Sequence, residues 1–143
     1  KNFIQEEQLS QYALIVVDEQ RIRLILNDPI LFQSGTHILK PKSKTVLNGL
    51  LNLILKVKNP MIIEGHTDDI PVKPGGKYRS NWDLAYYRAA AVTEYFINKG
   101  VKASRLSIAS FGDQRPIARN KTSLARKKNR RIEINVIRVK ARS

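Results

Sequence analysis

Two side chains of opposite charge lie where neighbouring elements of this sequence meet. Asp68 follows the apolar run 61–63, in a segment that turns polar and then reaches a proline, which is typical of a strand that opens into a loop. Arg88 falls on or beside the apolar face of the helix predicted next. Because an unpaired buried charge is strongly destabilising, we expect Arg88 to have a partner, and Asp68 is a candidate.

An acid and a guanidinium facing each other across a loop also have a chemical use. They can receive a zwitterion, with its ammonium group at Asp68 and its carboxylate at Arg88 as a planar two-point contact. Two structural alternatives remain open from the spacing alone. Asp68 and Arg88 can form an ion pair with each other, or Arg88 can extend its charged end to solvent.

The composition indicates one globular domain. The chain has 143 residues, of which 42% are apolar and 27% are charged. The absence of cysteine excludes a disulfide scaffold and a thiolate metal site. The sequence contains no run of 18 apolar residues, so it predicts no membrane span within these residues. The first residue is Lys1 and not methionine, which suits a piece of a longer protein.

The net charge of +14 is concentrated near the end of the chain. Residues 115–143 contain eleven Lys or Arg and one acid, Glu133. This balance predicts an anionic partner, and nucleic acid, an acidic lipid surface and an anionic cell-wall polymer all qualify on charge.

The pattern of apolar residues predicts an α+β fold, an α/β sandwich with helices packed on one face of a mixed sheet. Strands are expected at 12–17, 21–26, 61–67, 104–111 and 131–139, the first two as a hairpin. Residues 1–11 are expected to be a linker or the end of an upstream helix, and residues 12–143 the domain.

Three helices are expected between these strands. One follows Pro41, with Val46, Leu50, Ile54 and Val57 on its buried face. The second spans 80–99, where Ser80 and Asp83 form a capping-box pattern and Gly100 ends the helix. One or two helical turns are expected at 122–128.

Other arrangements of polar residues do not favour catalysis or a metal site. Glu64, His66 and Asp68 alternate along one strand face, but no second cluster completes a coordination shell. Asp68 and Asp69 are adjacent in an extended segment and point to opposite faces, so they are poorly placed to flank one glycosidic bond. We expect neither an enzyme, nor a metal ion, nor a cofactor.

Nucleic-acid binding is the main alternative of another class. The cluster 126–131 is basic and suits contacts with phosphates. It contains no aromatic residue for base stacking, and the chain has no motif of an RNA-binding sheet. We therefore expect no nucleic-acid partner.

Several short motifs, in order along the chain, resemble the OmpA-like peptidoglycan-binding domain over roughly residues 21–139. They are Gly65-His66-Thr67-Asp68, Asn81 with Leu84, Arg88-Ala89, Gly112 with Pro116, and Asn129-Arg130-Arg131-Ile132-Glu133. Three further segments resemble the MotB-like branch of that family, which comprises flagellar stator subunits. They are 32–36, 67–72 and 80–84.

The resemblance implies binding of the diaminopimelate residue in the stem peptide of peptidoglycan. Asp68 and Arg88 match the acidic and basic contacts of the family, and Thr67 and Asn81 match lesser contacts. Arg130 and Arg131 match a basic pair, of which we expect one member to support the site and the other to be structural. Many family members carry an acid shortly after the phenylalanine of the first loop. This chain has none after Phe32, so no contact is carried over there.

The resemblance also implies a setting for the whole protein. MotB-like proteins anchor the flagellar motor to the cell wall and perform no chemistry. The implied location is the periplasm, as the soluble part of an inner-membrane protein with one upstream span. The implied partners are peptidoglycan, a second copy in a homodimer, and a MotA-like channel subunit.

Overall fold

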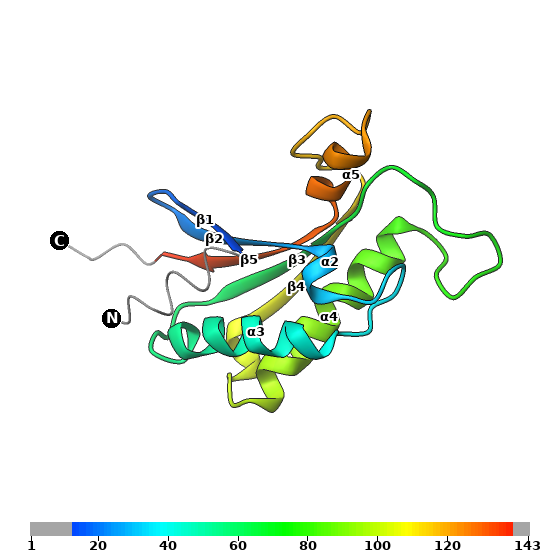
Figure 1. The fold of residues 1–143 in the computed structure, drawn as a ribbon. Coiled ribbons are helices and arrows are strands. Elements are labelled where there is room, and N and C mark those ends of the chain that lie inside the picture. The colour runs from blue at the N-terminus through cyan, green and yellow to red at the C-terminus, as the bar shows by residue number, and fades with distance from the viewer. Residues whose placement is uncertain (1–12, 139–143) are drawn as a thin grey trace.

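The computed structural model describes residues 13–138, and their centre is one mixed five-stranded sheet (Figure 1). The strands are β1 (Ala13–Val17), β2 (Arg21–Asn27), β3 (Met61–His66), β4 (Leu106–Gly112) and β5 (Arg131–Ile137). Their order is β1-β2-β5-β3-β4. Only β3 and β4 pair in parallel; the other neighbours are antiparallel. The expected linker at residues 1–11 lies outside the described residues.

The helices are α2 (Asp28–Leu31), α3 (Pro41–Ile54), α4 (Asn81–Asn98) and α5 (Ser123–Asn129), with a 3-10 turn at Ala103–Arg105. The long helices α3 and α4 cover one face of the sheet, and α5 lies at the end where β5 begins (Figure 1). This arrangement confirms the predicted α+β fold with helices on one face. Within the described residues, no helix combines the length and apolar character needed to cross a bilayer.

The core forms where the apolar stripes of α3 and α4 meet the sheet. The fully buried residues include Leu47 and Leu50 from α3, Phe96 from α4, and Ile63 and Ile134 from the sheet. The prediction that Val57 is buried was wrong. Helix α3 ends at Ile54, so Val57 lies beyond the helix and is 40% exposed.

Gly65 lets α4 pack directly against the sheet. A Cβ atom at this position would lie 2.1 Å from the carbonyl oxygen of Ala85 in α4, which no real side chain tolerates. The glycine therefore permits a close approach of helix and strand. It fixes the first turns of α4 beside the carboxyl end of β3, where Asp68 follows.

The second face of the sheet is polar yet largely buried. On β5, Ile132, Ile134 and Val136 face the helices, as predicted, while the intervening residues Glu133 and Asn135 are 2% and 1% exposed. Arg23 on β2 donates to Glu133 Oε1, at 3.0 Å from Nε and 2.9 Å from Nη2. Arg23 and Arg131 thus pair the buried carboxylate of Glu133 on this face.

Candidate functional site

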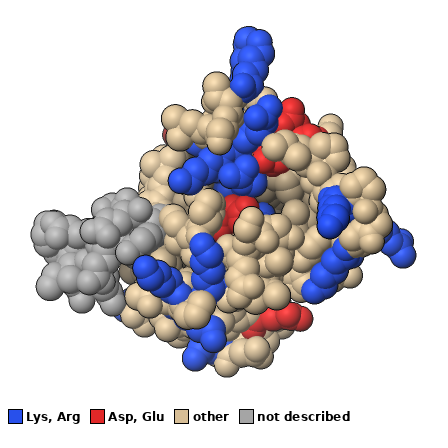
Figure 2. All heavy atoms as spheres, turned by 45° about the vertical axis from the view of Figure 1, so that its right-hand side comes forward, with Lys and Arg blue, Asp and Glu red and all other residues tan. Residues whose placement is uncertain are grey.

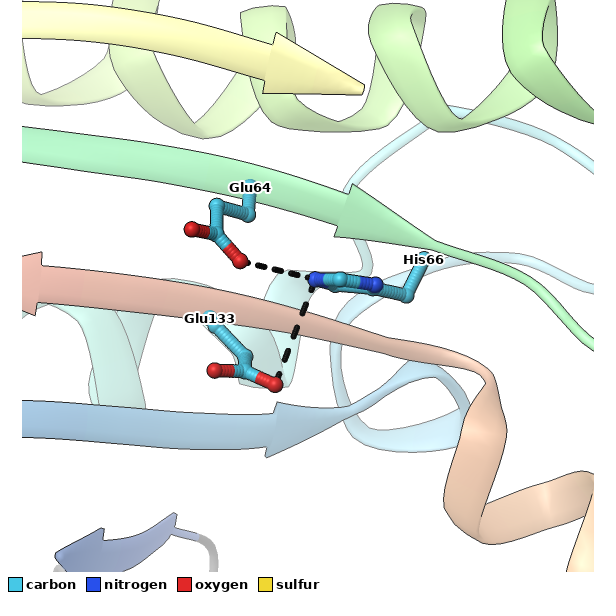
Figure 3. A group of neighbouring side chains, drawn as sticks. All are labelled: Glu64, His66 and Glu133. Carbon is cyan, nitrogen blue, oxygen red and sulfur yellow. Dashed lines mark hydrogen bonds and ion pairs between the residues drawn. The ribbon is translucent and has the colours of Figure 1, made fainter. Parts of the chain in front are cut away.

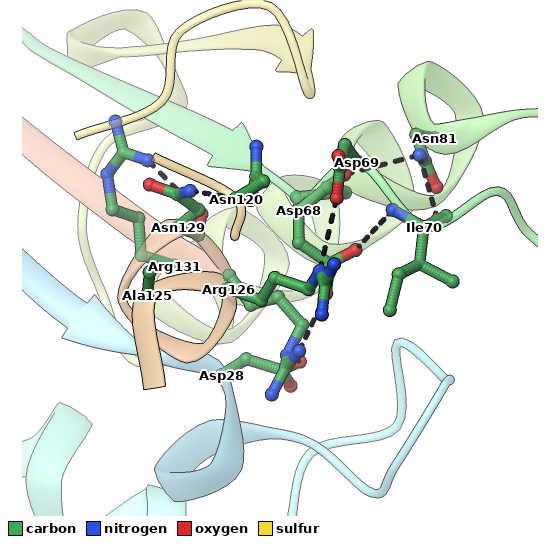
Figure 4. A network of polar contacts seen from close by, with 12 residues as sticks. Asp28, Asp68, Asp69, Ile70, Asn81, Asn120, Ala125, Arg126, Asn129 and Arg131 are labelled. Carbon is green, nitrogen blue, oxygen red and sulfur yellow. Dashed lines mark hydrogen bonds and ion pairs between the residues drawn. The ribbon is translucent and has the colours of Figure 1, made fainter. Parts of the chain in front are cut away.

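A pocket of about 740 Å³ opens at the carboxyl end of β3. Its walls come from α2, the segment after Phe32, the loop that follows β3 and the first turns of α4. Seven charged side chains line it. Asp28, Asp68, Arg88 and Arg130 contact one another, and the lysines Lys40, Lys73 and Lys77 add positive charge to the walls. Figure 4 shows Asp28 and Asp68 reaching the same region from segments far apart in the sequence.

Backbone contacts hold Asp68 and Thr67 in place after the strand ends. The amide of Thr67 donates to the carbonyl of Gly112, at 2.8 Å, which extends the contact with β4 by one residue. Asp68 Oδ1 accepts a hydrogen bond from the amide of Ile70, at 3.0 Å. The Asp68 side chain therefore has a defined orientation at the pocket wall, with 6% of the residue exposed.

The start of α4 is tied to the same loop. Ser80 caps the helix, because its hydroxyl accepts from the amide of Asp83, at 3.2 Å. Asp83 reaches back to the amide of Arg79, at 2.9 Å, one residue earlier than a standard capping box requires. Asn81 Nδ2 donates to the carbonyls of Asp68, at 3.3 Å, and Ile70, at 3.1 Å. Asn81 thus connects the helix start to the loop that carries Asp68 (Figure 4).

Asp68 and Arg88 do not pair with each other, so that part of the sequence interpretation was wrong. Arg88 Nη1 lies 2.9 Å from Asp28 Oδ2, and Arg88 Nε donates to the carbonyl of Thr36, at 2.7 Å. Arg130 Nη1 lies 2.6 Å from Asp68 Oδ2, and Arg130 Nε lies 3.4 Å from Asp28. The order of contacts is Arg88, Asp28, Arg130, Asp68. Charge therefore alternates along the pocket, and the four side chains sum to zero.

Sequence reasoning missed Asp28. Asp28 is the first residue of the short helix α2 and presents a buried carboxylate to Arg88. Burial raises the pKa of Asp28 above its ordinary value, and the nearby guanidinium of Arg88 only partly offsets this effect. One signal in the sequence points to Asp28. No acid follows Phe32, and Asp28, four residues before Phe32, lies next to Arg88 instead.

Five of the six predicted site residues line the pocket, namely Thr67, Asp68, Asn81, Arg88 and Arg130. The sixth residue, Arg131, does not. It is 3% exposed on the polar face of the sheet, and its Nε donates to Glu133, at 2.7 Å. Arg130 follows α5 with an extended backbone and lines the pocket, whereas Arg131 begins β5 and points to the polar face of the sheet.

Glu64, His66 and Glu133 meet on that polar face (Figure 3). His66 Nε2 lies 2.9 Å from Glu64 and 3.9 Å from Glu133. Both carboxylate oxygens of Glu133 already accept hydrogen bonds from arginines, Oε1 from Arg23 and Oε2 from Arg131. The two guanidinium groups balance the acids, so the group is explained as an internal ion-pair network. Asp68 does not join it, because the chain turns into the pocket after β3.

The two arginines determine how Glu133 titrates. Burial alone would raise the pKa of Glu133, but the hydrogen bonds and charges of Arg131 and Arg23 outweigh it and lower the pKa below its ordinary value. The carboxylate therefore stabilises the fold when it is ionised.

Residues 31–130 match the OmpA family. Motility protein B of Bacillus subtilis is 30% identical over 141 residues, which cover 96% of this chain and 53% of that protein. The chain thus spans about half the length of this curated relative.

Solved structures share the fold. The crystal structure of a MotB-like protein from Desulfovibrio vulgaris superposes with a TM-score of 0.87 at 25% identity, covering 95% of this chain and 93% of that one. The cell wall anchor of the T6SS from Pseudomonas aeruginosa superposes with a TM-score of 0.86 at 26% identity, covering 94% of each chain.

Proposed function

This chain belongs to the OmpA family, and we propose that it is a peptidoglycan-binding domain whose pocket grips a zwitterionic diamino acid of the stem peptide. It is a binding domain and not an enzyme, as are its OmpA-like and MotB-like relatives. The observation that carries the proposal is the pocket with Asp28, Asp68, Arg88 and Arg130 on its walls.

The pairing of charges supports a zwitterionic ligand. The paired side chains Asp28, Asp68, Arg88 and Arg130 sum to zero, so a ligand with a single charge would leave an uncompensated charge among them, which is costly. A carbon that bears both an ammonium and a carboxylate keeps the sum of these four side chains and the ligand at zero. Its ammonium suits Asp68, and its carboxylate suits the planar guanidinium of Arg88.

Asp28 and Arg130 complete this arrangement. Asp28 keeps Arg88 paired before the ligand arrives, and Arg130 does the same for Asp68. The contacts are therefore organised in advance, and binding requires little side-chain ordering. We assign Asp28 to the site for this reason, together with Thr67 and Asn81, which hold the loop.

The wider role follows from the relatives. The similarity to Motility protein B and to the MotB-like structure supports a periplasmic domain that anchors a flagellar stator to the wall. That role includes a homodimer, a MotA-like channel subunit and an upstream membrane span. The similarity to the T6SS wall anchor supports the alternative of another cell-wall tether. The pocket serves either role in the same way.

Binding to insoluble peptidoglycan tests the proposal. We expect Asp68→Asn to weaken binding at least about tenfold, because a charge-assisted contact is worth roughly 1.5–3 kcal/mol. Arg88→Lys should also weaken it, because lysine keeps the charge but loses the two-point contact. Asp69→Asn is the matched control: its side chain is 48% exposed and pairs with Arg126.

Competition by free amino acids tests the zwitterion. Free meso-diaminopimelate should displace the domain from peptidoglycan, whereas Nα-acetyl-lysine, whose ammonium and carboxylate lie on different carbons, should displace it far less. Circular dichroism melting curves check that each variant is folded. Equal binding by folded Asp68→Asn and Asp69→Asn proteins, or equal displacement by the two amino acids, would exclude recognition by this pocket.

A further inference from the structure

A basic surface lies beside the pocket and is not used by it. It consists of α5 and the loop before it, and we call it the α5 surface. Its exposed basic residues are Arg115, Arg119, Lys121, Lys127 and Lys128. Asp113 is the only acid in residues 113–130. Figure 2 shows Lys and Arg gathered at the upper end of the molecule, where Figure 1 draws α5.

The α5 surface is held as one rigid unit by a buried asparagine. Asn129 is 0% exposed, and its Oδ1 accepts from the amides of Ile117, at 2.8 Å, and Ala118, at 3.0 Å. Its Nδ2 donates to the carbonyl of Ala118, at 2.8 Å, and to Asn120 Oδ1, at 2.7 Å (Figure 4). The loop is therefore pinned to α5, and its charges are fixed relative to those of the helix.

The α5 surface is continuous with the pocket. Arg130, the first residue after α5, reaches into the pocket and contacts Asp68 and Asp28. Arg126 on α5 lies 3.3 Å from Asp69, the residue after Asp68. These three ion pairs are the ones that Arg126 and Arg130 make within residues 13–138, and all of them lie on the pocket side of the surface. The lysines farther along α5 have no acid beside them in that part of the chain.

We propose that the α5 surface binds a phosphodiester polymer attached to the cell wall. Like charges held close together repel, and a polyanion relieves this repulsion while releasing its own counterions. Guanidinium and ammonium groups both bind phosphate well. The ring beside these residues, Phe111, is half-buried and already stacks with His66 and with the guanidinium of Arg115, 3.8 Å from its centroid, which disfavours base stacking and so single-stranded nucleic acid as the occupant.

This inference rests on the proposed function, because a polymer attached to the wall lies beside the pocket only if the pocket binds peptidoglycan. The two contacts then act together. One ligand in the pocket raises the effective concentration of the polymer at the α5 surface, so that modest affinities combine.

The test uses cell-wall sacculi from a bacterium with phosphodiester wall polymers, before and after hydrofluoric acid removes those polymers. The variant is Lys121→Gln/Lys127→Gln/Lys128→Gln. The matched control is Lys42→Gln/Lys44→Gln/Lys56→Gln, which removes the same charge from exposed positions on and after α3. Neither set lines the pocket.

We expect the α5 variant to bind untreated sacculi about tenfold more weakly than the wild type, and treated sacculi equally well. On untreated sacculi, the logarithmic salt slope of its binding should fall by about two, from counterion release at three sites. The control variant should follow the wild type in both.

Each other outcome has a defined meaning. Equal binding of wild type to both kinds of sacculi, or equal losses in the two variants, overturns the inference and leaves the pocket proposal standing. Failure of the wild type to bind treated sacculi contradicts the pocket proposal instead. If the wild type binds anionic phospholipid vesicles or duplex DNA more tightly than untreated sacculi, at equal phosphate concentration, the inference is wrong and the α5 surface binds that partner instead.

Discussion

At the scale of single residues, charge pairing decides what each side chain does. Asp28 and Glu133 are both buried acids, yet their pKa values move in opposite directions. Burial dominates at Asp28 and raises its pKa. At Glu133, hydrogen bonds from two arginines, one to each carboxylate oxygen, overcome burial and lower it. Asp28 also lies beside two arginines, but only Arg88 lowers its pKa through a hydrogen bond, and the charge of Asp68 opposes the arginines.

The pairing at Glu133 predicts how the fold responds to acid. A carboxyl group with a lowered pKa adds stability above its ordinary pKa of 4.5 and loses it as the pH falls through the lower folded value. Arg23→Met removes one of the two arginines and lets the pKa of Glu133 rise. The unfolding free energy of this variant should therefore fall less between pH 7 and pH 3 than that of the wild type.

Urea unfolding at a series of pH values measures this difference. Arg21→Met is the matched control, because Arg21 is also half-buried on β2 but donates to the neutral Asn135, at 3.3 Å. It should keep the acid dependence of the wild type. If both variants respond to acid alike, the lowered pKa of Glu133 does not arise from Arg23.

At the scale of elements, the site depends on how α4 begins. The helix starts beside the loop that carries Asp68, and Gly65 lets its first turns lie against β3. Asn81 then bonds two carbonyls of the loop. Any change that frays this end therefore acts on the pocket as well as on the helix.

The cap of α4 gives a prediction at this scale. Ser80→Ala removes the acceptor for the amide of Asp83 and should lower the unfolding free energy by about 1 kcal/mol. It should also weaken peptidoglycan binding, because Asn81 is the next residue. Thermal and chemical denaturation measure the first effect and sacculus binding the second.

Thr122→Ala is the comparison for this variant. Thr122 caps α5 through the amide of Ala125, at 3.0 Å, away from the loop of Asp68. It should cost a similar free energy while leaving the binding of sacculi stripped of phosphodiester polymers unchanged. If Ser80→Ala and Thr122→Ala lose binding to stripped sacculi equally, the cap of α4 has no specific effect on the pocket.

At the scale of the whole molecule, β1 and β4 are the two edge strands of the sheet within the described residues. Strand β1 pairs only with β2 within the described residues, and Leu14 and Val17 on it are 60% and 59% exposed. An apolar edge strand is a template for pairing with a second chain. It offers a route to the homodimer that we propose for this family member.

The open edge predicts concentration-dependent association. Leu14→Lys should reduce it, because a lysine on an edge strand disfavours pairing with another copy, and should change the unfolding free energy by no more than about 0.5 kcal/mol. Leu124→Lys is the control, since Leu124 is 66% exposed on α5, away from this edge. Sedimentation velocity over a range of concentrations compares the two. Association that survives in Leu14→Lys takes another route.

The sequence by itself determined the elements and most of the pocket. Helix periodicity placed Arg88 on the inner face of α4, and the Ser80 cap fixed where that helix starts. Each of these depends on spacing within one element, which local geometry sets.

Tertiary structure alone decided which charges pair. Arg88 pairs with Asp28, 60 positions earlier in the chain, and Asp68 pairs with Arg130, 62 positions later. No periodicity connects such residues. Their contacts arise because the sheet order places β5 beside both β2 and β3, so that Asp28 after β2, Asp68 after β3 and Arg130 before β5 meet at one end of the sheet.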